Sequence, residues 1–407
     1  MPSWKRTLAV MVGAQFTSSL GLSFIFPILP FYIQGLRSST NLSIEALAGL
    51  VFSVQALTMA IASPFWGVIA DRYGRKPMVM RAMLGGAVVS GLLGFAGSVE
   101  QVIALRALQG TLTGVVAAAS ALVAAVCPRD RMGYAMGWLQ VGLWGGHAAG
   151  PVLGGILSDL AGFRVTFLVT AGLLALSGVS VWLGVQEPFV RAEHLPPGGL
   201  TFLRDWRRVL TTGRIAVTLL QRFLLAVGRS TMGPVLPLFV LALAPASGRA
   251  GTFTGVIVGA EFAVSTLTAV SLGRLGDRVG HARVAFASAV FATVFYIPQA
   301  LAQDVWQLLV LHAVTGVALG GLIPSLSALL ARQSRAGDEG CAYGIDSSVA
   351  AAGRAVGPLL GAACAVWFSL RVAFLATSAV FALLTIVAAR AVFPPRTGET
   401  PPTERQG

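Results

Sequence analysis

Charged residues are scarce in this chain of 407 residues: Asp, Glu, Lys and Arg make up 11% of it, hydrophobic residues make up 55%, and the mean hydropathy is +0.78. Soluble domains carry roughly 25% charged residues. A water-soluble fold could not solvate its surface with so few charges. A lipid bilayer removes that requirement, because the outer surface then faces hydrocarbon. The composition therefore predicts an integral membrane protein whose surrounding partner is the bilayer.

Cysteine and nucleotide-binding motifs are also rare or missing. The three cysteines, Cys127, Cys341 and Cys364, show no metal-ligand or redox spacing, so we expect them to pack and we expect no metal site. The chain has no Walker loop of the form Gly-x-x-x-x-Gly-Lys-[Ser/Thr], so ATP does not power it. No nucleophile, acid/base or metal-binding residues cluster at a common depth, as an enzyme would require. We therefore expect a protein that is not an enzyme and has no cofactor.

What the sequence has in abundance is long apolar runs. Residues 83–97 and 372–388 are apolar on every face, which indicates helices rather than the ~10-residue alternating strands of a membrane barrel. A spanning helix takes ~20 apolar residues, so 407 residues hold about twelve such helices with their loops. We expect helices at about 8–33, 46–70, 78–97, 102–126, 134–159, 163–185, 213–242, 251–273, 284–301, 305–331, 341–368 and 371–392.

The formal net charge of +13 is distributed unevenly along the chain, which argues against a nucleic-acid partner. If the odd-numbered connections lie outside, the inner face collects Lys5, Arg6, Arg72, Arg75, Lys76, Arg81, Arg129, Arg131, Arg204, Arg207, Arg208, Arg274, Arg278, Arg283, Arg332 and Arg335. The outer loops keep little beyond Arg37, Arg164, Arg249 and Arg371. This positive-inside bias predicts a multi-pass membrane protein with both termini in the cytoplasm. The first apolar segment is too long for a cleavable signal peptide.

The two halves of the chain repeat each other at an offset of 206 or 207 residues. The matching pairs are Pro27-Ile28-Leu29-Pro30 with Pro234-Val235-Leu236-Pro237, Gly67-x-x-x-Asp71-Arg72-x-Gly74 with Gly273-x-x-x-Asp277-Arg278-x-Gly280, Leu105-Arg106-Ala107 with Leu311-His312-Ala313, Gly150-Pro151-x-Leu153 with Gly357-Pro358-x-Leu360, and Phe163-Arg164-Val165 with Leu370-Arg371-Val372. Parallel repeats of six helices are the layout of alternating-access carriers.

This duplication sets the domain organisation that we predict. An N-terminal six-helix bundle covers 1–185 and a C-terminal bundle covers 213–392. Between them, 186–212 forms a cytoplasmic linker in which 201–210 could lie on the membrane as a short basic amphipathic helix. The Pro-rich tail, 393–407, is expected to be disordered and cytoplasmic.

Several motifs resemble those of the major facilitator superfamily, and the resemblance covers nearly the whole chain. Gly67-Val68-Ile69-Ala70-Asp71-Arg72-Tyr73-Gly74-Arg75-Lys76-Pro77 is similar to the signature between helices 2 and 3 of that family. Leu105-Arg106-x-x-Gln109-Gly110 resembles the helix 4 motif of proton-coupled members, and the Gly142 to Gly155 segment resembles the helix 5 motif of antiporters. Trp4-Lys5-Arg6 and Ser63-Pro64-Phe65-Trp66-Gly67 look closest to small bacterial multidrug-resistance exporters.

The resemblance implies an all-α integral membrane fold with twelve transmembrane helices in two pseudo-symmetric six-helix bundles. It implies a drug/proton antiporter of a bacterial cytoplasmic (inner) membrane, with the proton gradient as its energy source. It also implies a conformational gate at Gly67, Asp71, Arg72, Gly74, Arg75, Lys76, Asp277 and Arg278, although positive-inside anchoring would explain the same charges. The antiporter motif of helix 5 falls on Gly146, Gly150, Pro151 and Gly154, where small residues and a proline would also serve close packing alone.

Ionisable residues inside the bilayer are costly and are candidates for function. Glu261 is the only carboxylate near the middle of an expected helix. Arg229 is expected at a similar depth, and Arg222 and Arg354 also lie within helices. We hypothesise that Glu261 carries the proton against one of these arginines. A static buried ion pair is the alternative.

Four further ionisable residues have two interpretations each. For Arg106 the resemblance implies proton coupling, whereas a side chain that reaches the outer interface is the alternative. Asp346 either relays protons inward or favours a helix N-terminus. His147 and His312 have no metal-ligand neighbours, so packing or a hydrogen bond between helices is favoured over a proton relay.

The first helix contains no acidic residue, which argues against cationic substrates, and the arginines favour neutral, zwitterionic or anionic ones. An apolar substrate cavity is expected to use Gln15, Phe16, Phe24, Trp138 and Trp144. We predict a monomer that exports small amphipathic drug-like molecules in exchange for protons. Export or flipping of one physiological solute, such as a glycolipid, siderophore or metabolite, is the alternative. A receptor would not need the duplication.

Overall fold

The protein is helical throughout, apart from one isolated β-bridge between Arg37 and Ser98 in the part that is described. The computed structural model describes residues 4–128, 131–187, 213–244, 248–334 and 339–392. The expected linker from 188 to 212 and the tail from 393 therefore lie outside the described residues, and the domain boundaries stay predictions.

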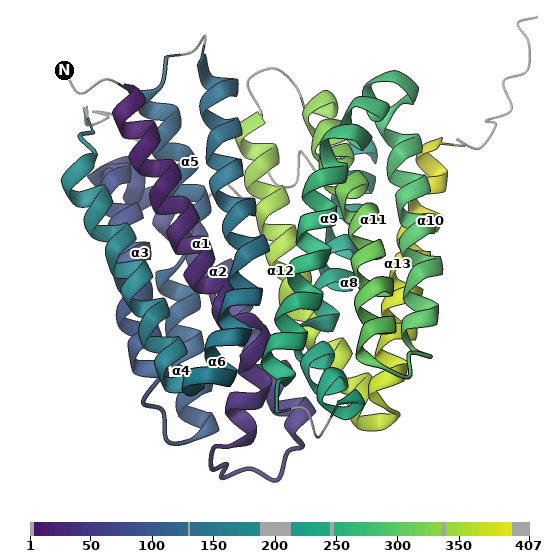
Figure 1. Ribbon diagram of the computed structural model, residues 1–407. Coiled ribbons are helices and arrows are strands. Elements are labelled where there is room, and N and C mark those ends of the chain that lie inside the picture. Colours follow the sequence, from purple (N-terminus) through teal and green to yellow (C-terminus); the bar gives the residue numbers. More distant parts are fainter. Residues whose placement is uncertain (1–3, 129–130, 188–212, 245–247, 335–338, 393–407) are drawn as a thin grey trace, which may run out of the picture.

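The helices form two groups that lie side by side (Figure 1). The first group is α1 (Trp4–Gln34), α2 (Ile44–Tyr73), α3 (Arg75–Leu93), α4 (Val99–Leu112), α5 (Val115–Val126) and α6 (Met132–Gly184). The second is α8 (Gly213–Leu243), α9 (Ala250–Val279), α10 (His281–Gln299), α11 (Val305–Gln333), α12 (Glu339–Trp367) and α13 (Leu370–Val392).

Nine helices of the described chain are long and apolar enough to cross a membrane. One of these is α6, whose 53 residues cross twice, because Gly162 breaks it with φ 81°. With α3 and the pair α4–α5, the crossings total twelve, as the sequence predicts. The first helix begins and α13 ends at one face, drawn at the top of Figure 1 and called here the terminal face. The face where α1 ends is called the opposite face.

The internal repeat is visible in the helix boundaries. Both α2 and α9 have 30 residues, both α3 and α10 have 19, and each pair starts at an offset of 206. The turn between the two helices is made in each half by one glycine of positive φ, Gly74 at 97° and Gly280 at 99°. Glycine adopts this conformation without the steric cost that a Cβ brings. The halves are therefore pseudo-symmetric in structure as well as in sequence.

The expected single helix over 102–126 is wrong in one respect, because it is broken into α4 and α5. Gly114 has φ 131°, and Thr113 turns both its amide and its hydroxyl back to the Gln109 carbonyl at 2.9 and 2.7 Å. These bonds satisfy the last turn of α4 and end it. An apolar sequence pattern cannot show this break, since small residues on both sides suit a continuous helix equally well.

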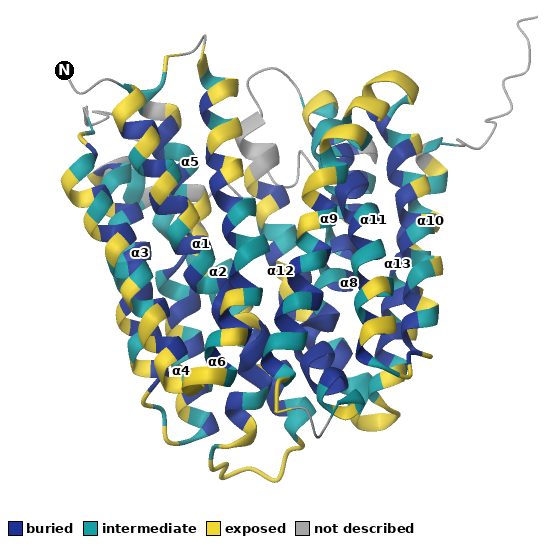
Figure 2. Cartoon of the chain, in the orientation of Figure 1, coloured by how far each residue is buried: buried dark blue, intermediate teal, exposed yellow. Residues whose placement is uncertain are grey.

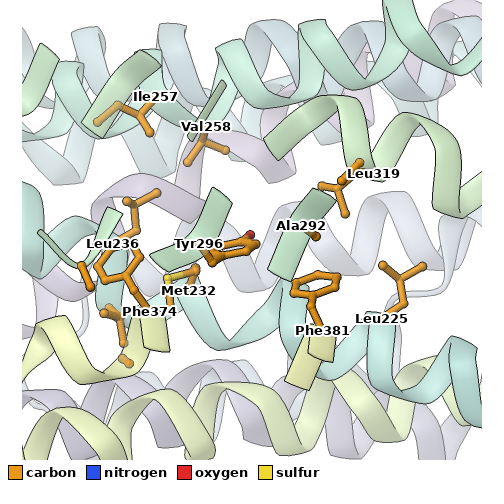
Figure 3. Packing of buried hydrophobic residues seen from close by; sticks show 14 of the residues in the cluster. Leu225, Met232, Leu236, Ile257, Val258, Ala292, Tyr296, Leu319, Phe374 and Phe381 are labelled. Atoms are coloured by element: carbon orange, nitrogen blue, oxygen red, sulfur yellow. The ribbon is translucent and has the colours of Figure 1, made fainter. Parts of the chain in front are cut away.

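Each half has its own apolar core. In the C-terminal half a large cluster is built around Tyr296, whose ring stacks on Phe381 at a centroid distance of 5.3 Å (Figure 3). Phe239 and Phe374 pack beside it with centroids 5.0 Å apart. The N-terminal half holds two further clusters, one around Met83 and one around Phe167. Separate cores allow each half to keep its shape if the two move relative to each other.

The two halves touch through glycines that allow backbone contact. A Cβ at Gly255 of α9 would overlap the Pro151 carbonyl of α6, and a Cβ at Gly49 of α2 would lie 3.0 Å from the Pro358 carbonyl of α12. These contacts are equivalent under the repeat. Just before the break in α6 at Gly162, Asp159 accepts a hydrogen bond from the Thr252 backbone N–H at 2.7 Å. All of this packing lies toward the opposite face.

Toward the terminal face the same helices are much more exposed (Figure 2). In α2, none of the described residues from 54 to 73 is buried. In α9, only Ser265 and Gly276 are buried from 262 to 279, whereas most of the first three turns is buried. The halves are thus closed against each other at the opposite face and separate toward the terminal face.

Candidate functional site

The buried acid of the C-terminal half is held by a histidine. Glu261 in α9 is 7% exposed, and its Oε2 lies 3.2 Å from Nε2 of His312 in α11, which is 2% exposed. The other ring nitrogen, Nδ1, lies 2.9 Å from Oε1 of Gln299 at the end of α10. Gln299 is fully buried. Three helices therefore meet at one hydrogen-bonded chain inside the apolar region.

This arrangement corrects the expected pairing of Glu261. The hypothesis gave it an arginine as direct partner, but its contact is His312. Arg229 lies within electrostatic range of both Glu261 and Tyr296. The favoured interpretation of His312 included a hydrogen bond between helices, and the structure places such a contact at Glu261.

Aromatic side chains from both halves meet beside this acid. The guanidinium carbon of Arg229 lies 4.8 Å from the ring centroid of Phe262, the neighbour of Glu261 in α9. Trp144 and His147 of α6 approach the same ring at 6.2 and 5.5 Å between centroids. We call Trp144, His147, Arg229 and Phe262 the bridging cluster. It joins α6 of one half to α8 and α9 of the other at the depth where burial gives way to exposure.

Asp346 and Arg222 form a separate, bidentate ion pair. Arg222 Nε donates to Oδ1 of Asp346 at 2.6 Å, and Nη2 donates to Oδ2 at 2.7 Å. The pair joins α8 to α12. Asp346 lies two turns inside α12, so its carboxylate is bound to a cation and does not cap the helix. Arg354 lies about two turns after Asp346 in α12. It is exposed, and it lies within electrostatic range of Arg229, Arg222 and Asp346.

Arg106 is buried rather than turned to the outer interface. It is 6% exposed, which contradicts the alternative in which it reaches the membrane surface. Its Nη1 donates to Oε1 of Gln109 at 2.7 Å, and Gln109 donates to Ser90 Oγ at 3.2 Å. The Phe52 ring centroid lies 5.8 Å from the guanidinium carbon. Its role in proton coupling stays a prediction.

The expected gate is only partly described. The side chains of Asp71 and Arg72, and the surroundings of Gly67, lie outside the described residues. The backbone N–H groups of Arg75 and Lys76 donate to the Glu187 carboxylate at 2.8 to 3.0 Å. This ties the start of α3 to the end of the N-terminal half.

The second copy of the expected gate lies at the end of α9 and the start of α10, in the described part of the chain. Asp277 is 67% exposed, and its partners, His281 at 3.2 Å and Arg332 at 3.8 Å, both belong to its own half. Arg278 is exposed at the end of α9. A latch between the halves therefore stays a prediction, and this end of the molecule is where it would have to close.

The glycines of the helix 5 motif serve close packing. A Cβ at Gly146 would lie 2.6 Å from the Phe16 carbonyl, and one at Gly150 would lie 2.8 Å from the Leu20 carbonyl. Gly154 packs in the same way against Phe24, so α6 runs along α1 with almost no gap. Pro151 continues the stripe and contacts α9 of the other half.

Of the five residues expected in the cavity, one reaches the bridging cluster. Trp144 does so, whereas Gln15 and Phe24 are buried in α1, with Gln15 bonded to Ser19 at 3.1 Å. Phe16 packs on Gly145 and is partly exposed. Trp138 is exposed and stands next to Tyr134 near the terminal face.

Sequence reasoning missed Gln299, Phe262 and the direct role of His312. A signal was present for His312, because the repeat aligns it with Arg106 at an offset of 206. Because His312 occupies the position of a motif arginine, the repeat made it a candidate for proton coupling rather than for packing alone.

A duplicated bundle of twelve membrane crossings, with ionisable residues buried inside each half, defines a multi-pass membrane transporter. The sequence comparison identifies the family to which this transporter belongs. The model of the Major Facilitator Superfamily matches residues 11–243 and again 218–407, and the chain belongs to this family. It is a transporter and not an enzyme.

Similar proteins are known in bacteria. The multidrug resistance protein MdtG of Escherichia fergusonii is 34% identical over 379 residues, which cover 93% of this chain and 92% of that protein. MdtG of Dickeya zeae is 34% identical over 378 residues, with 93% and 92% covered.

Solved structures share the fold at low sequence identity. A mutant of the nucleoside transporter NupG superimposes with a TM-score of 0.78 at 13% identity, over 95% of this chain and all (100%) of that one. A bacterial homologue of the human lysosomal transporter Spinster, inward-facing and occupied, gives 0.76 at 14% identity, over 96% and 97%. These likenesses support the fold alone.

Proposed function

We propose that this protein exports amphipathic drug-like compounds from the cytoplasm in exchange for protons. It acts as a monomer in a bacterial cytoplasmic membrane, with both termini in the cytoplasm, and uses the proton gradient with no cofactor. The similarity to the MdtG multidrug resistance proteins over almost the full length supports the substrate class.

The observation that carries the proposal is the position of the buried acid beside the bridging cluster. Glu261 is adjacent in sequence to Phe262, whose ring contacts Trp144 of the other half. A protonation change at Glu261 therefore occurs next to side chains that hold the two halves together. Charged groups buried in a membrane protein are costly, so an acid here points to function.

The packing of the two halves supports alternating access as part of this proposal. The described helices are closed at the opposite face through the paired glycine contacts and exposed toward the terminal face. With the termini in the cytoplasm, this is a state open to the cytoplasm. The return to the outward-open state separates Gly255 from Pro151 and brings the gate segments near Asp277 toward the other half.

The charge of the site favours substrates that are not cationic. Arg229 and Arg354 lie within electrostatic range of each other, and Arg354 is exposed. Trp144 and Phe262 offer aromatic surface next to these cations. A neutral, zwitterionic or anionic amphipathic molecule fits this combination better than a cation does, because like charges repel.

The test is transport by the purified protein in sealed liposomes with an imposed pH gradient. We expect Glu261→Gln to abolish gradient-driven movement of fluorescent amphipathic compounds, because the amide cannot take up a proton. Glu45→Gln, the same change in the first turn of α2, should transport normally. Undiminished proton coupling in Glu261→Gln would remove this acid from the mechanism. Activity toward a single solute in a broad panel would favour a dedicated exporter.

A further inference from the structure

The amide of Gln299 has only one orientation that satisfies its neighbours. Its Nε2 donates to the Phe295 carbonyl at 2.9 Å, one turn back in α10. A flipped amide would place Oε1 against that carbonyl oxygen, and two acceptors cannot bond. Oε1 must therefore face Nδ1 of His312, at 2.9 Å. Because Oε1 only accepts, Nδ1 must carry the hydrogen.

This orientation determines what the other ring nitrogen can do. A neutral histidine with hydrogen on Nδ1 has a lone pair on Nε2. That lone pair points to Glu261 Oε2 at 3.2 Å, and an ionised carboxylate offers only lone pairs in return. The contact is attractive only if a hydrogen lies between these atoms, on either one.

We propose that Glu261 and His312 share one proton as a unit, and that Gln299 is the positioning residue that confines this proton to the contact between them. The inference rests on the proposed function for its role in transport, but the proton count itself follows from the hydrogen bonds. In this cytoplasm-facing state the unit has no net charge, whether it is written as acid and imidazole or as carboxylate and imidazolium.

Loss of the shared proton turns the contact repulsive. Two lone pairs would then face each other in a buried site, and Glu261 would carry a full negative charge. The cation within electrostatic range is Arg229 of α8, and the other titratable neighbour is Tyr296 of α10. The carboxylate would therefore turn from α11 toward α8 and the bridging cluster, where Arg229 faces Phe262 and Trp144. His147 of α6 and Arg354 of α12 complete the charged and titratable groups around Arg229. Proton release is thus linked to the side chains that join the halves.

The tautomer of His312 is directly measurable. The chain has four histidines, so ¹⁵N-histidine labelling of the full protein in lipid gives four rings to resolve by solid-state NMR, and His312→Gln assigns the signal. We expect the wild-type ring to be either neutral with hydrogen on Nδ1 or doubly protonated. A dominant neutral form with hydrogen on Nε2 would overturn the proposal, because such a ring can donate to an ionised Glu261 without a shared proton.

Replacing the positioning residue tests its role. In Gln299→Leu the acceptor for Nδ1 is lost, so the hydrogen can move to Nε2, and we expect that tautomer to appear. The pH midpoint of transport should fall by about one unit, a tenfold change in proton concentration. Gln303→Leu, an exposed neighbour after α10, should change neither readout. An unchanged ring spectrum in Gln299→Leu refutes the positioning role. Gln299→Met, of similar length, repeats the test if the leucine variant does not fold.

The two proposals fail in different ways. If Glu261→Gln keeps proton coupling while wild-type His312 shows hydrogen on Nδ1, the shared proton stands as a structural feature and the transport role of Glu261 falls. If coupling is lost but His312 is neutral with hydrogen on Nε2, the shared proton falls and Glu261 alone remains the carrier.

Discussion

The contact between Gly255 and Pro151 should determine how firmly the opposite face is closed. A Cβ at position 255 would lie 2.8 Å from the carbonyl carbon of Pro151 and 3.2 Å from Val152 Cα, all backbone atoms that cannot rotate away. Carbon atoms at rest lie about 3.5 Å or more apart. In Gly255→Ala, α6 and α9 must therefore move apart by about 0.7 Å or more in the closed state.

The overlap at position 255 raises the free energy of the closed conformation only, so it changes the population ratio of the two conformations directly. Overpacking in a tight site costs about 1–3 kcal/mol. If the contact separates in the outward-open state, that state does not bear the cost, and its population relative to the closed state rises by about 5- to 150-fold. Gly172→Ala is the matched control, since a Cβ at that position of α6, the other helix of the contact, meets nothing within 4 Å.

The assay is a pair of distance measurements by electron paramagnetic resonance on spin labels in lipid, in a background lacking the native cysteines. Labels at Leu160 and Leu301 report on the opposite face, and labels at Tyr134 and Leu275 report on the terminal face; all four residues are exposed. We expect Gly255→Ala to lengthen the first distance and shorten the second. Identical distance distributions in Gly255→Ala and Gly172→Ala would refute the argument that this contact closes the opposite face.

Two further outcomes concern stability. The Ser39 backbone N–H donates to the Glu100 carboxylate at 2.8 Å at the exposed start of α4, and the Ser39 hydroxyl donates at 2.9 Å. Together with the other hydrogen bonds of this turn, they lower the pKa of Glu100 to about 2. A lowered folded-state pKa adds stability that is present above the unfolded value of ~4.3 and is lost as pH falls through the folded value. The melting-temperature difference between wild type and Glu100→Gln should therefore be constant near neutral pH and vanish near pH 2; a difference independent of pH would contradict this. Asp346→Asn should destabilise the protein by about 3 kcal/mol, because it leaves the Arg222 guanidinium without its carboxylate. Adding Arg222→Gln should recover part of this loss in thermal unfolding, and a fully additive double variant would show that the pair does not act as a unit.

The sequence was sufficient for the architecture because the features that set it are local or repeated. Twelve apolar segments, and a glycine turn at Gly74 copied at Gly280, follow from composition and an offset between halves. The break after Thr113 did not follow, since it depends on hydrogen bonds to one carbonyl rather than on the apolar pattern.

The pairing of buried charges was beyond the sequence for a different reason. Arg222 and Asp346 are 124 residues apart, and several arginines were equally available to each acid. The position of a residue along a helix gives its depth in the membrane, but it does not say which neighbouring helix the side chain faces. Which face of α9 carries Glu261 toward α11 depends on how glycines such as Gly316 let the two helices approach, and this requires the packed structure.

The repeat places different chemistry on the same scaffold in the two halves. A Cβ at Gly316 would lie 2.5 Å from the Glu261 carbonyl, and a Cβ at Gly110 would overlap the equivalent carbonyl of Gln55, so the helices approach in the same way in both halves. At an offset of 206, Glu261 therefore corresponds to the neutral Gln55. The side chain that can take up a proton at this depth is present in one copy and replaced by an amide in the other.

The partners of these two positions differ accordingly. His312, which faces the acid, corresponds to Arg106, which donates instead to the amide of Gln109 at 2.7 Å. An arginine stays charged across physiological pH, whereas a histidine changes its charge in that range. At these equivalent positions the N-terminal half thus holds an arginine and the C-terminal half holds the proposed proton-sharing unit. In the proposed mechanism the change of charge at these equivalent positions belongs to the C-terminal half alone, so protonation there alters the attraction between the halves rather than acting equally on both.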